Sequence, residues 1–552
     1  MTARREAALA ALGAVIVSAV MKAPALVGLG RSIPKDLADP LYQSWQLAWG
    51  AHALQTSPLS PWDANILWPL RMSFAFNDSL YGYAPLSVLF GSGATAALVR
   101  YSVVFVLAYA LAAAGSYLLA RQLGCRPVAA GVAAGIYAFA PWHLSQDGHL
   151  NVLSNGAVPL CLALLARGHG IGVRGDGGPK RPWCALAGWV IAAWQLTVTL
   201  VVGLQLTYLL GALVIGATVL LILGRWRPFF GTGRALLIAD LVGLAIFVAV
   251  AAALAQPYYT VAAAHPQVVR TVNDLNFYSP PLLGFLIAPA ESTVWGALHA
   301  SARAELGWPV EQAMSVGAVA ALLATYGVLA GVWSRRRRLS LALSAGVLLL
   351  VAAGTAVAGG RVFLLLFDYA PGWRSVRTPG RLVILVALAV ALLAANGVEA
   401  LCRSARRPRL TGLALIGLVL LEGHGALPAP RVPSPSPGLA IASKPVLVLP
   451  SDDALDFQTM WASTDGFPSI VNGVTAFLPR PLVEMRRLSV GFPDAESVAF
   501  LRQAGVRSVV LRPALSSGTP WAGAENRPVE GLGLRVRTAG NDLVYDLTPG
   551  RA

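Results

Sequence analysis

The sequence predicts an α-helical polytopic membrane protein with a small α/β domain at its C-terminal end. Of its 552 residues, 56% are hydrophobic and only 12% are charged, whereas charged residues make up about a quarter of an ordinary soluble protein. Apolar stretches long enough to cross a bilayer recur up to residue 426, and the remainder has a soluble composition. These observations exclude an ordinary soluble enzyme.

The apolar stretches predict about eleven transmembrane helices, because each crossing needs ~20 residues. The segment 183–224 carries no charge, and we interpret it as two short helices that break near Thr197–Thr199. The predicted spans are 7–29, 97–120, 128–142, 151–167, 183–197, 201–224, 232–254, 314–333, 340–358, 380–401 and 409–426.

Basic residues give the predicted orientation. The formal charge of +16 is divided among small clusters between the spans, which argues against a nucleic-acid surface and indicates cytoplasmic loops. The N-terminus is then cytoplasmic and the C-terminal domain extracytoplasmic. Many Ala, Gly and Arg residues with few Lys are typical of a GC-rich bacterium, so we expect the bacterial plasma (inner) membrane. The clusters are Arg4/Arg5, Arg121/Arg126, Arg167 to Arg181, Arg225/Arg227/Arg234, Arg335 to Arg338 and Arg403 to Arg409.

The N-terminal stretch has the charged start and apolar core of a signal peptide. Because many spans follow, we expect a retained signal anchor. The spans give a transmembrane domain at 1–426 with exterior loops at 30–95, 255–313 and 359–379. A Pro/Ser-rich linker at 427–440 then leads to an α/β domain at 441–552.

Two aspartates open the first exterior loop, in "SIPKDLADPLYQSWQLAW". Asp36 and Asp39 precede a run in which Leu41, Trp45 and Trp49 recur every fourth residue. This spacing predicts a short helix, and we expect it to lie in the membrane interface with its tryptophans at headgroup depth. Pro40 disfavours a helical Asp39, so both carboxylates belong to the turn before the helix. A purely electrostatic role of Asp39 at the helix N-terminus is the alternative.

Further polar residues on the exterior side are candidates for binding substrate. Gln146, Asp147 and His149 lie at the mouth of the third and fourth spans, although mutual hydrogen bonding explains them as well. In the second loop, Asp274 and Glu305 are candidates for binding sugar hydroxyls or a cation. No metal site follows from the spacing of His or Cys residues.

The third loop breaks the charge rule most clearly, with Arg374, Arg377 and Arg381 spaced by three and four. Arginines on the exterior side at headgroup depth suit an anionic lipid phosphate, because the guanidinium fork binds phosphate oxygens bidentately. Contact with ordinary phospholipid headgroups is the simpler alternative. Inside the membrane, we expect the acid Asp240 to pair with the nearby Arg234 rather than to act in catalysis.

The tail shows an α/β pattern. "KPVLVLP" and "VRSVVLRP" predict buried strands, and "FPDAESVAFLRQAG" predicts a helix that starts at Asp494 and ends at Gly505. "LRVRT" and "NDLVYDL" predict a hairpin that turns at Gly540-Asn541. We interpret this domain as a lid or an acceptor-binding module, with plain stabilisation as the alternative.

Together these features resemble the GT-C class of membrane glycosyltransferases. The residues that carry the resemblance are the acidic turn of "DLADPLYQSWQLAW", then "PGWRSVRTPGRLVIL", and "VNGVTAFLP" with "LRQAGVRSVVL". The resemblance implies a polyprenyl-phosphate-linked sugar as donor, a glycan, lipid or protein acceptor outside the cytoplasm, and a first-loop carboxylate as general base. That role falls on Asp36 or Asp39, whose spacing leaves the choice between them and the need for a divalent cation open.

Two other classes of function fit the same pattern. A multi-pass lipid or glycan transporter would also need many spans, but the sequence has no convincing internal repeat and no symmetric pair of broken helices. A non-catalytic scaffold for envelope assembly is the other alternative.

Overall fold

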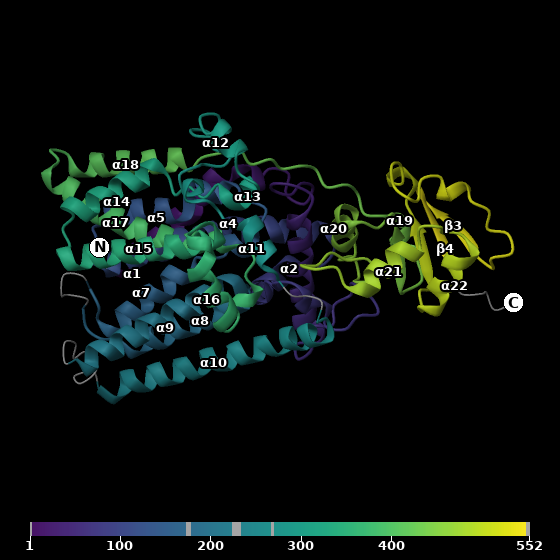
Figure 1. Cartoon of the computed structure of the whole chain (residues 1–552), viewed down its shortest axis with the longest axis horizontal. Helices are drawn as coiled ribbons and strands as arrows, with labels where there is room; N and C mark the ends of the chain where they lie inside the picture. Colours follow the sequence, from purple (N-terminus) through teal and green to yellow (C-terminus); the bar gives the residue numbers. More distant parts are fainter. Residues whose placement is uncertain (1–2, 173–177, 224–232, 267–269, 548–552) are drawn as a thin grey trace. The chain divides into compact units, whose positions relative to one another are not determined.

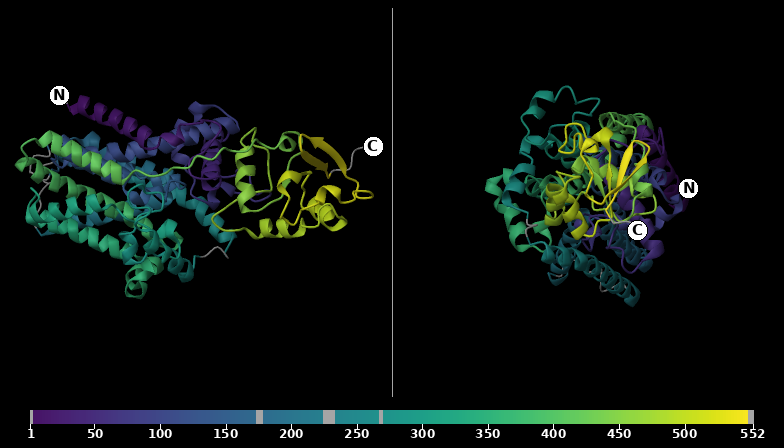
Figure 2. Two further views of the ribbon diagram at one scale, coloured as in Figure 1. Left: turned by 90° about the horizontal axis from the view of Figure 1, so that it is seen from above. Right: turned by 90° about the vertical axis from the view of Figure 1, so that its right-hand side faces the viewer.

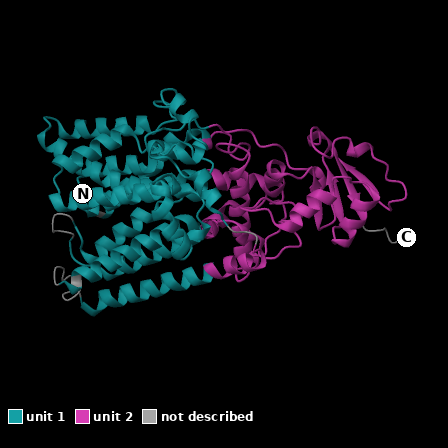
Figure 3. Cartoon of the chain, in the orientation of Figure 1, with its two compact units in different colours: residues 1–24, 104–254, 269–427 teal, residues 25–103, 255–268, 428–552 magenta. Residues whose placement is uncertain are grey.

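The computed structural model describes residues 3–172, 178–223, 233–266 and 270–547, so the predicted cytoplasmic residues Arg225 and Arg227 lie outside the described part (Figure 1). The chain divides into two compact units (Figure 3). Unit 1 contains residues 1–24, 104–254 and 269–427, and unit 2 contains residues 25–103, 255–268 and 428–552.

Each predicted span overlaps a helix, although the first helix ends at Met21 rather than near 29, and the long helices of unit 1 run side by side (Figure 1). Five helical segments among the described residues are long and apolar enough to cross a membrane: Ala94–Gln122, Leu150–His169, Leu200–Leu220, Gly233–Ala264 and Pro379–Ser404. A multi-pass membrane protein is therefore confirmed, whereas the number of crossings stays a prediction. The helices at the predicted spans are α1 (Ala3–Met21), α4 (Ala94–Gln122), α5 (Pro127–Phe139), α7 (Ala157–His169), α8 (Pro182–Val198), α9 (Leu200–Ile222), α10 (Gly233–Ala264), α14 (Ala318–Ala330), α15 (Arg335–Ala352), α17 (Val383–Ser404) and α18 (Pro408–Glu422).

The long apolar segment after residue 182 is broken where the sequence predicted. Helix α8 ends at Val198 and α9 begins at Leu200, with Thr199 in an extended conformation between them (φ −158°, ψ 126°). Two helices rather than one therefore occupy this segment.

Helix α17 forms the core of unit 1. Nearly all of its residues are buried, and Asn396 donates through Nδ2 to the carbonyl of Gly327 on α14 (2.8 Å) while its Oδ1 accepts from Trp333 N (2.9 Å). Glycines such as Gly327 permit close approach of helices, and an interhelical amide then satisfies backbone groups that lipid cannot. The pair α14 and α17 is thus a rigid support for the loops at its ends.

The first exterior loop corrects one expectation. The predicted helix exists as α2 (Asp39–Thr56), but Leu41, Trp45 and Trp49 are buried within the protein. The indole Nε1 of Trp45 donates to Asn65 Oδ1 (3.0 Å), and that of Trp49 donates to the carbonyl of Pro61 (2.8 Å). The apolar face therefore packs against α20 (Asp453–Ala462) and α3 (Ala84–Ser87) instead of lying at lipid headgroups.

The tail contains a four-stranded sheet in the order β1-β2-β4-β3. Strands β1 (Val446–Leu449) and β2 (Ser508–Leu511) are parallel and buried, while β4 (Asp542–Asp546) pairs antiparallel with β2 and with β3 (Arg535–Ala539). Figure 2 shows β3 and β4 among the yellow elements near the C-terminal end of the chain. Helix α22 (Ala495–Gln503) has Asp494 as its N-cap, and Gly505 lies in the left-handed region (φ +83°). The predicted strands, helix and hairpin are confirmed.

The linker after the last transmembrane helix is held by the first loop. Ile33 N donates to Pro430 O (3.1 Å) and Lys35 N to Pro428 O (2.7 Å), and Val432 N donates to Arg31 O (2.9 Å). These backbone bonds lie directly before Asp36 and Asp39. The acidic turn is thereby fixed at its N-terminal side.

Candidate functional site

The two first-loop aspartates have different surroundings. Asp36 is exposed, and its Oδ1 accepts from Ala38 N (2.9 Å), which closes a local turn. Asp39 is half-buried and is the first residue of α2, with Pro40 next to it. Proline at this position has no N–H to leave unpaired, so it suits a helix start. Asp36 therefore lies in the predicted turn, whereas the expectation that Asp39 also lies there was wrong, because Asp39 is the first residue of α2.

Other polar groups surround the start of α2. Burial raises the pKa of Tyr42 well above its usual value, a hydrogen bond with Asn77 opposes this, and the negative charges of Asp39 and Asp78 raise it further. Both carboxylates are thus within electrostatic range of the Tyr42 hydroxyl. Gln46, one turn later on α2, donates through Nε2 to the Tyr42 hydroxyl (3.0 Å) and to the carbonyl of Asp78. We call Asp39, Tyr42, Gln46 and Asp78 the acidic cluster of unit 2.

Aromatic groups from the end of α10 line the same cluster. The Tyr258 hydroxyl donates to the carbonyl of Asn77 (2.9 Å), and its ring contacts that of Trp62 edge-on at 5.8 Å. Our interpretation of the sequence missed Asp78 and Tyr258. The only signal for Asp78 is its position in an aromatic-rich part of the same exterior loop, in "FAFNDSLYGY".

Unit 1 contains a group of arginines. The guanidinium of Arg377, which is half-buried, lies over the ring of Tyr278 at 5.2 Å. Burial lowers the pKa of Arg270, and the positive charge of Arg377 lowers it further, while Asp274 and Tyr278 act in the opposite direction. Arg270 and Arg377 are therefore close enough to repel each other. Our interpretation of the sequence did not single out Arg270, because nothing local relates it to Arg377.

The predicted Arg381 is buried in an ion pair. Its guanidinium donates through Nε (3.2 Å) and Nη2 (2.5 Å) to the carboxylate of Glu311. Burial opposes ionisation of Glu311, but Arg381 with the more distant His149 and Arg377 holds the pKa of this carboxyl below its usual value. The charge of Arg381 is thus balanced by Glu311, and this pair lies within electrostatic range of Arg377 and His149.

The turn after α5, which the sequence predicts on the exterior side of the membrane, is buried within unit 1. Asp147 is fully buried and pairs with Lys22 Nζ (2.8 Å), and it accepts from the Tyr109 hydroxyl (2.5 Å). Gln146 is also buried and donates through Nε2 to Val310 O (2.7 Å). These two predicted substrate-binding residues therefore have partners within the protein.

The remaining candidates have local surroundings. Arg374 and Glu305 are exposed. Asp274 forms a capping box with Thr271 at the start of α11 (Val272–Tyr278), and backbone and side-chain hydrogen bonds with Thr271 lower its pKa despite partial burial. Arg270 and Arg377 lower that pKa further, so Asp274 also balances the arginines.

Two further expectations concern charged and metal-binding groups. Asp240 is paired as expected, but its partners are His169 Nε2 (3.3 Å) and Trp189 Nε1 (3.1 Å), while Arg234 is exposed. The predicted partner Arg234 was therefore wrong. The four cysteines are free and buried. Within the described ranges, no group of three or more His, Cys, Asp or Glu residues is arranged to hold a metal ion.

The fold resembles that of known membrane glycosyltransferases. The arabinofuranosyltransferase AftD from Mycobacteria aligns with 99% of this chain at 18% identity and a TM-score of 0.51, and a mutant of the same enzyme aligns at 16% identity and a TM-score of 0.52. The chain spans only 40% and 42% of those two proteins. ArnT from Cupriavidus metallidurans also aligns, with 97% of this chain and 98% of that protein covered, at 15% identity and a TM-score of 0.38.

Comparisons by sequence give no relatives, because no family model and no curated protein matches the chain. The predicted GT-C resemblance is confirmed at the level of the fold.

Proposed function

We propose that the protein is a membrane glycosyltransferase that moves a sugar from a polyprenyl-phosphate donor to a hydroxyl of an extracytoplasmic glycan, lipid or protein. The observation that carries the proposal is the acidic cluster of unit 2, in a chain that shares its fold with an arabinofuranosyltransferase. An acid at a helix start beside a buried tyrosine, with a second acid in the same loop, provides what a proton acceptor needs.

Asp39 is the general base in this proposal. A sugar on a lipid phosphate already has a good leaving group, so the demanding proton transfer is the one from the acceptor hydroxyl. As that oxygen bonds to the anomeric carbon, its proton passes to Asp39, and the bond from carbon to the phosphate oxygen breaks with both electrons on the phosphate. Attack from the face opposite the phosphate inverts the anomeric centre.

The choice of Asp39 over Asp36 rests on their surroundings. Asp36 is exposed and one of its oxygens closes a turn, whereas Asp39 is half-buried on α2 near Tyr42 and Asp78. A base acts efficiently when its position is fixed and water around it is limited. Asp78 provides a second negative charge near the Tyr42 hydroxyl.

Arg377 and Arg270 are the proposed ligands of the donor phosphate. Their mutual repulsion is relieved when an anion binds between them, and Tyr278 supports Arg377 through its ring. Arg381 contributes less, because Glu311 already neutralises it. The predicted Gln146 and Asp147 support this region from inside unit 1, and Arg374, Glu305 and His149 stay candidates for the sugar or the lipid.

Transfer by the purified chain tests the proposal. The assay uses the full chain in detergent with polyprenyl-phosphate arabinofuranose as first donor, since the structural neighbour transfers arabinofuranosyl groups, and other polyprenyl-phosphate sugars next. Asp39→Asn should lower kcat by about 10²–10⁴-fold, the usual contribution of a general base, while the matched Asp36→Asn should retain most of the activity. Full activity of Asp39→Asn would exclude Asp39 as the base. Absence of transfer by the wild type with every donor would refute the proposal that the protein is a glycosyltransferase.

A further inference from the structure

Backbone hydrogen bonds connect the first exterior loop to the tail sheet within unit 2. Leu67 N donates to Asn472 O (3.2 Å), Trp68 N to Ile470 O (3.0 Å), and Ile470 N to Asn65 O (2.8 Å). The same tail segment pairs with the start of β1, where Val471 N donates to Val446 O (2.9 Å). The first loop is thus bonded to the segment 470–472, which is itself bonded to β1.

Asn65 links this segment to helix α2. Its Oδ1 accepts from the buried indole of Trp45 (3.0 Å), and its Nδ2 donates to Ser463 Oγ (3.0 Å) and Pro468 O (2.9 Å). Trp45 lies in the second turn of α2, six residues after Asp39. Asn65 therefore uses both ends of its amide to join the helix that carries Asp39 to the tail.

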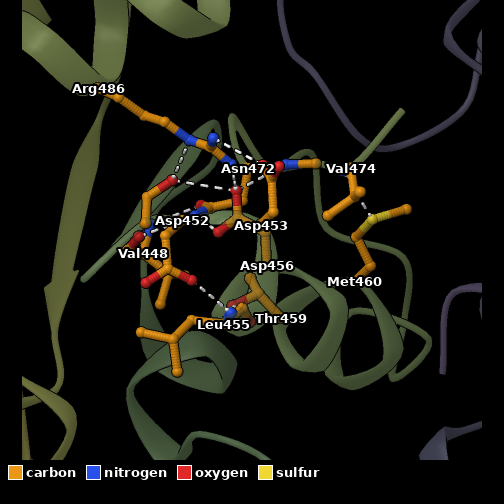
Figure 4. A network of polar contacts seen from close by, with 12 residues as sticks. Val448, Asp452, Asp453, Leu455, Asp456, Thr459, Met460, Asn472, Val474 and Arg486 are labelled. Carbon is orange, nitrogen blue, oxygen red and sulfur yellow. Dashed lines mark hydrogen bonds and ion pairs between the residues drawn. The ribbon is translucent and has the colours of Figure 1, made fainter. Parts of the chain in front are cut away.

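A second asparagine fixes the tail segment itself (Figure 4). The Asn472 side chain accepts from Val448 N and donates to Val448 O (both 2.8 Å), and its Nδ2 also donates to Asp456 Oδ1 (2.7 Å). The other carboxylate oxygen, Asp456 Oδ2, accepts from Arg486 Nη2 (2.9 Å) and Ser451 Oγ (3.0 Å). Both Asn472 and Asp456 are fully buried.

We infer that Asn65 and Asn472 are positioning residues for the base, and that the tail acts as a brace for α2. The inference rests on the proposed function of Asp39. A buried network whose groups are all paired is rigid, because any displacement leaves polar atoms unpaired. The chain of contacts runs from Asp456 through Asn472 and the segment 470–472 to Asn65 and Trp45. A displacement of about 1 Å of a catalytic group can cost about 10²-fold in rate.

Trp45→Phe is the first test, because it keeps an aromatic ring and removes the donor to Asn65, and the control variant has the same loss of ring volume. Trp521→Phe is the matched control, since its buried indole donates to Ser489 O (2.7 Å) inside the tail core and forms no hydrogen bond with the residues of this chain of contacts. Both should lower the thermal stability of the full chain in detergent by a similar small amount. Asn65→Ala is the second variant, because it removes all three side-chain hydrogen bonds of Asn65 and not only the one from Trp45.

Two readouts distinguish bracing from plain stabilisation. Hydrogen–deuterium exchange of residues 39–56 should become at least about fivefold faster in Trp45→Phe and Asn65→Ala, and stay unchanged in Trp521→Phe. In the transfer assay, kcat should fall at least tenfold in the same two variants with the donor KM within about twofold. Unchanged exchange and kcat in both variants would overturn the inference. If the wild type transfers no sugar, the exchange result still decides whether the tail holds α2, so failure of the proposed function is recognised separately.

Discussion

Asp456 makes the stability of the tail depend on pH in a direction that the structure defines. Its carboxyl is fully buried, and burial raises its pKa to about 6 from 3.8, although Arg486, Asn472 and Gly473 oppose the rise. A raised pKa means that the folded state binds the proton more tightly than the unfolded state. The contribution of the protonated Asp456 carboxyl to the free energy of unfolding is therefore complete below about pH 4 and is lost as the pH rises through about 6.

The size of the effect follows from the shift of about two units. One unit corresponds to about 1.36 kcal/mol, so Asp456 lowers the free energy of unfolding by about 3 kcal/mol between pH 4 and pH 7. Asp456→Asn removes this contribution, because an amide does not titrate in this range. The difference in stability between wild type and variant should then change by about 3 kcal/mol across that interval, in favour of the variant at high pH.

Hydrogen exchange of strand β2 in the full chain measures this difference. Protection of Ser508–Leu511, corrected for the intrinsic rate at each pH, gives a free energy of opening for wild type and Asp456→Asn. Other carboxyls titrate in both proteins and cancel in the difference. A difference that does not depend on pH would refute the reasoning, and one that grows in favour of the wild type with pH would show that Arg486 dominates over burial.

Three further outcomes follow from ion pairs and arginines in unit 1. Lys22→Met leaves Asp147 buried without its cation and should lower the free energy of unfolding by about 3–5 kcal/mol, measured as loss of folded protein in detergent. The double variant Lys22→Met with Asp147→Asn should recover much of this stability. An additive loss in the double variant would contradict the pairing. Glu311→Gln frees the charge of Arg381, so inorganic phosphate should bind more tightly than to wild type by calorimetry, whereas unchanged affinity would mean that Arg381 is out of reach of the anion. Arg377→Gln should raise the donor KM by about tenfold or more with a smaller change in kcat, and an unchanged KM would exclude it as a phosphate ligand.

The sequence predicts local structure well wherever the signal lies within a few residues. The break at Thr199, the cap at Asp494 and the hairpin at Gly540 are each encoded by neighbouring residues, and all three are present. The environment of α2 was predicted wrongly, because the spacing of Trp45 and Trp49 identifies an apolar face without saying whether lipid or protein covers it.

The candidate site was harder to predict because its contacts join distant parts of the chain. Lys22 and Asp147 are 125 positions apart, and Arg381 and Glu311 are 70 apart. No local sequence pattern indicates such pairs. The sequence singled out Asp39 as a candidate and not Asp78, although both affect the pKa of the Tyr42 hydroxyl.

The two roles of charge in the proposed reaction have different kinetic consequences. Glycosyl transfer from a lipid phosphate makes two separate electrostatic demands, a proton acceptor at the attacking oxygen and positive charge at the departing phosphate. Because the phosphate charge is present in the bound donor as well as in the transition state, arginine variants should change mainly KM. The proton moves only during the reaction, so variants of Asp39 and of the residues that brace it should change mainly kcat.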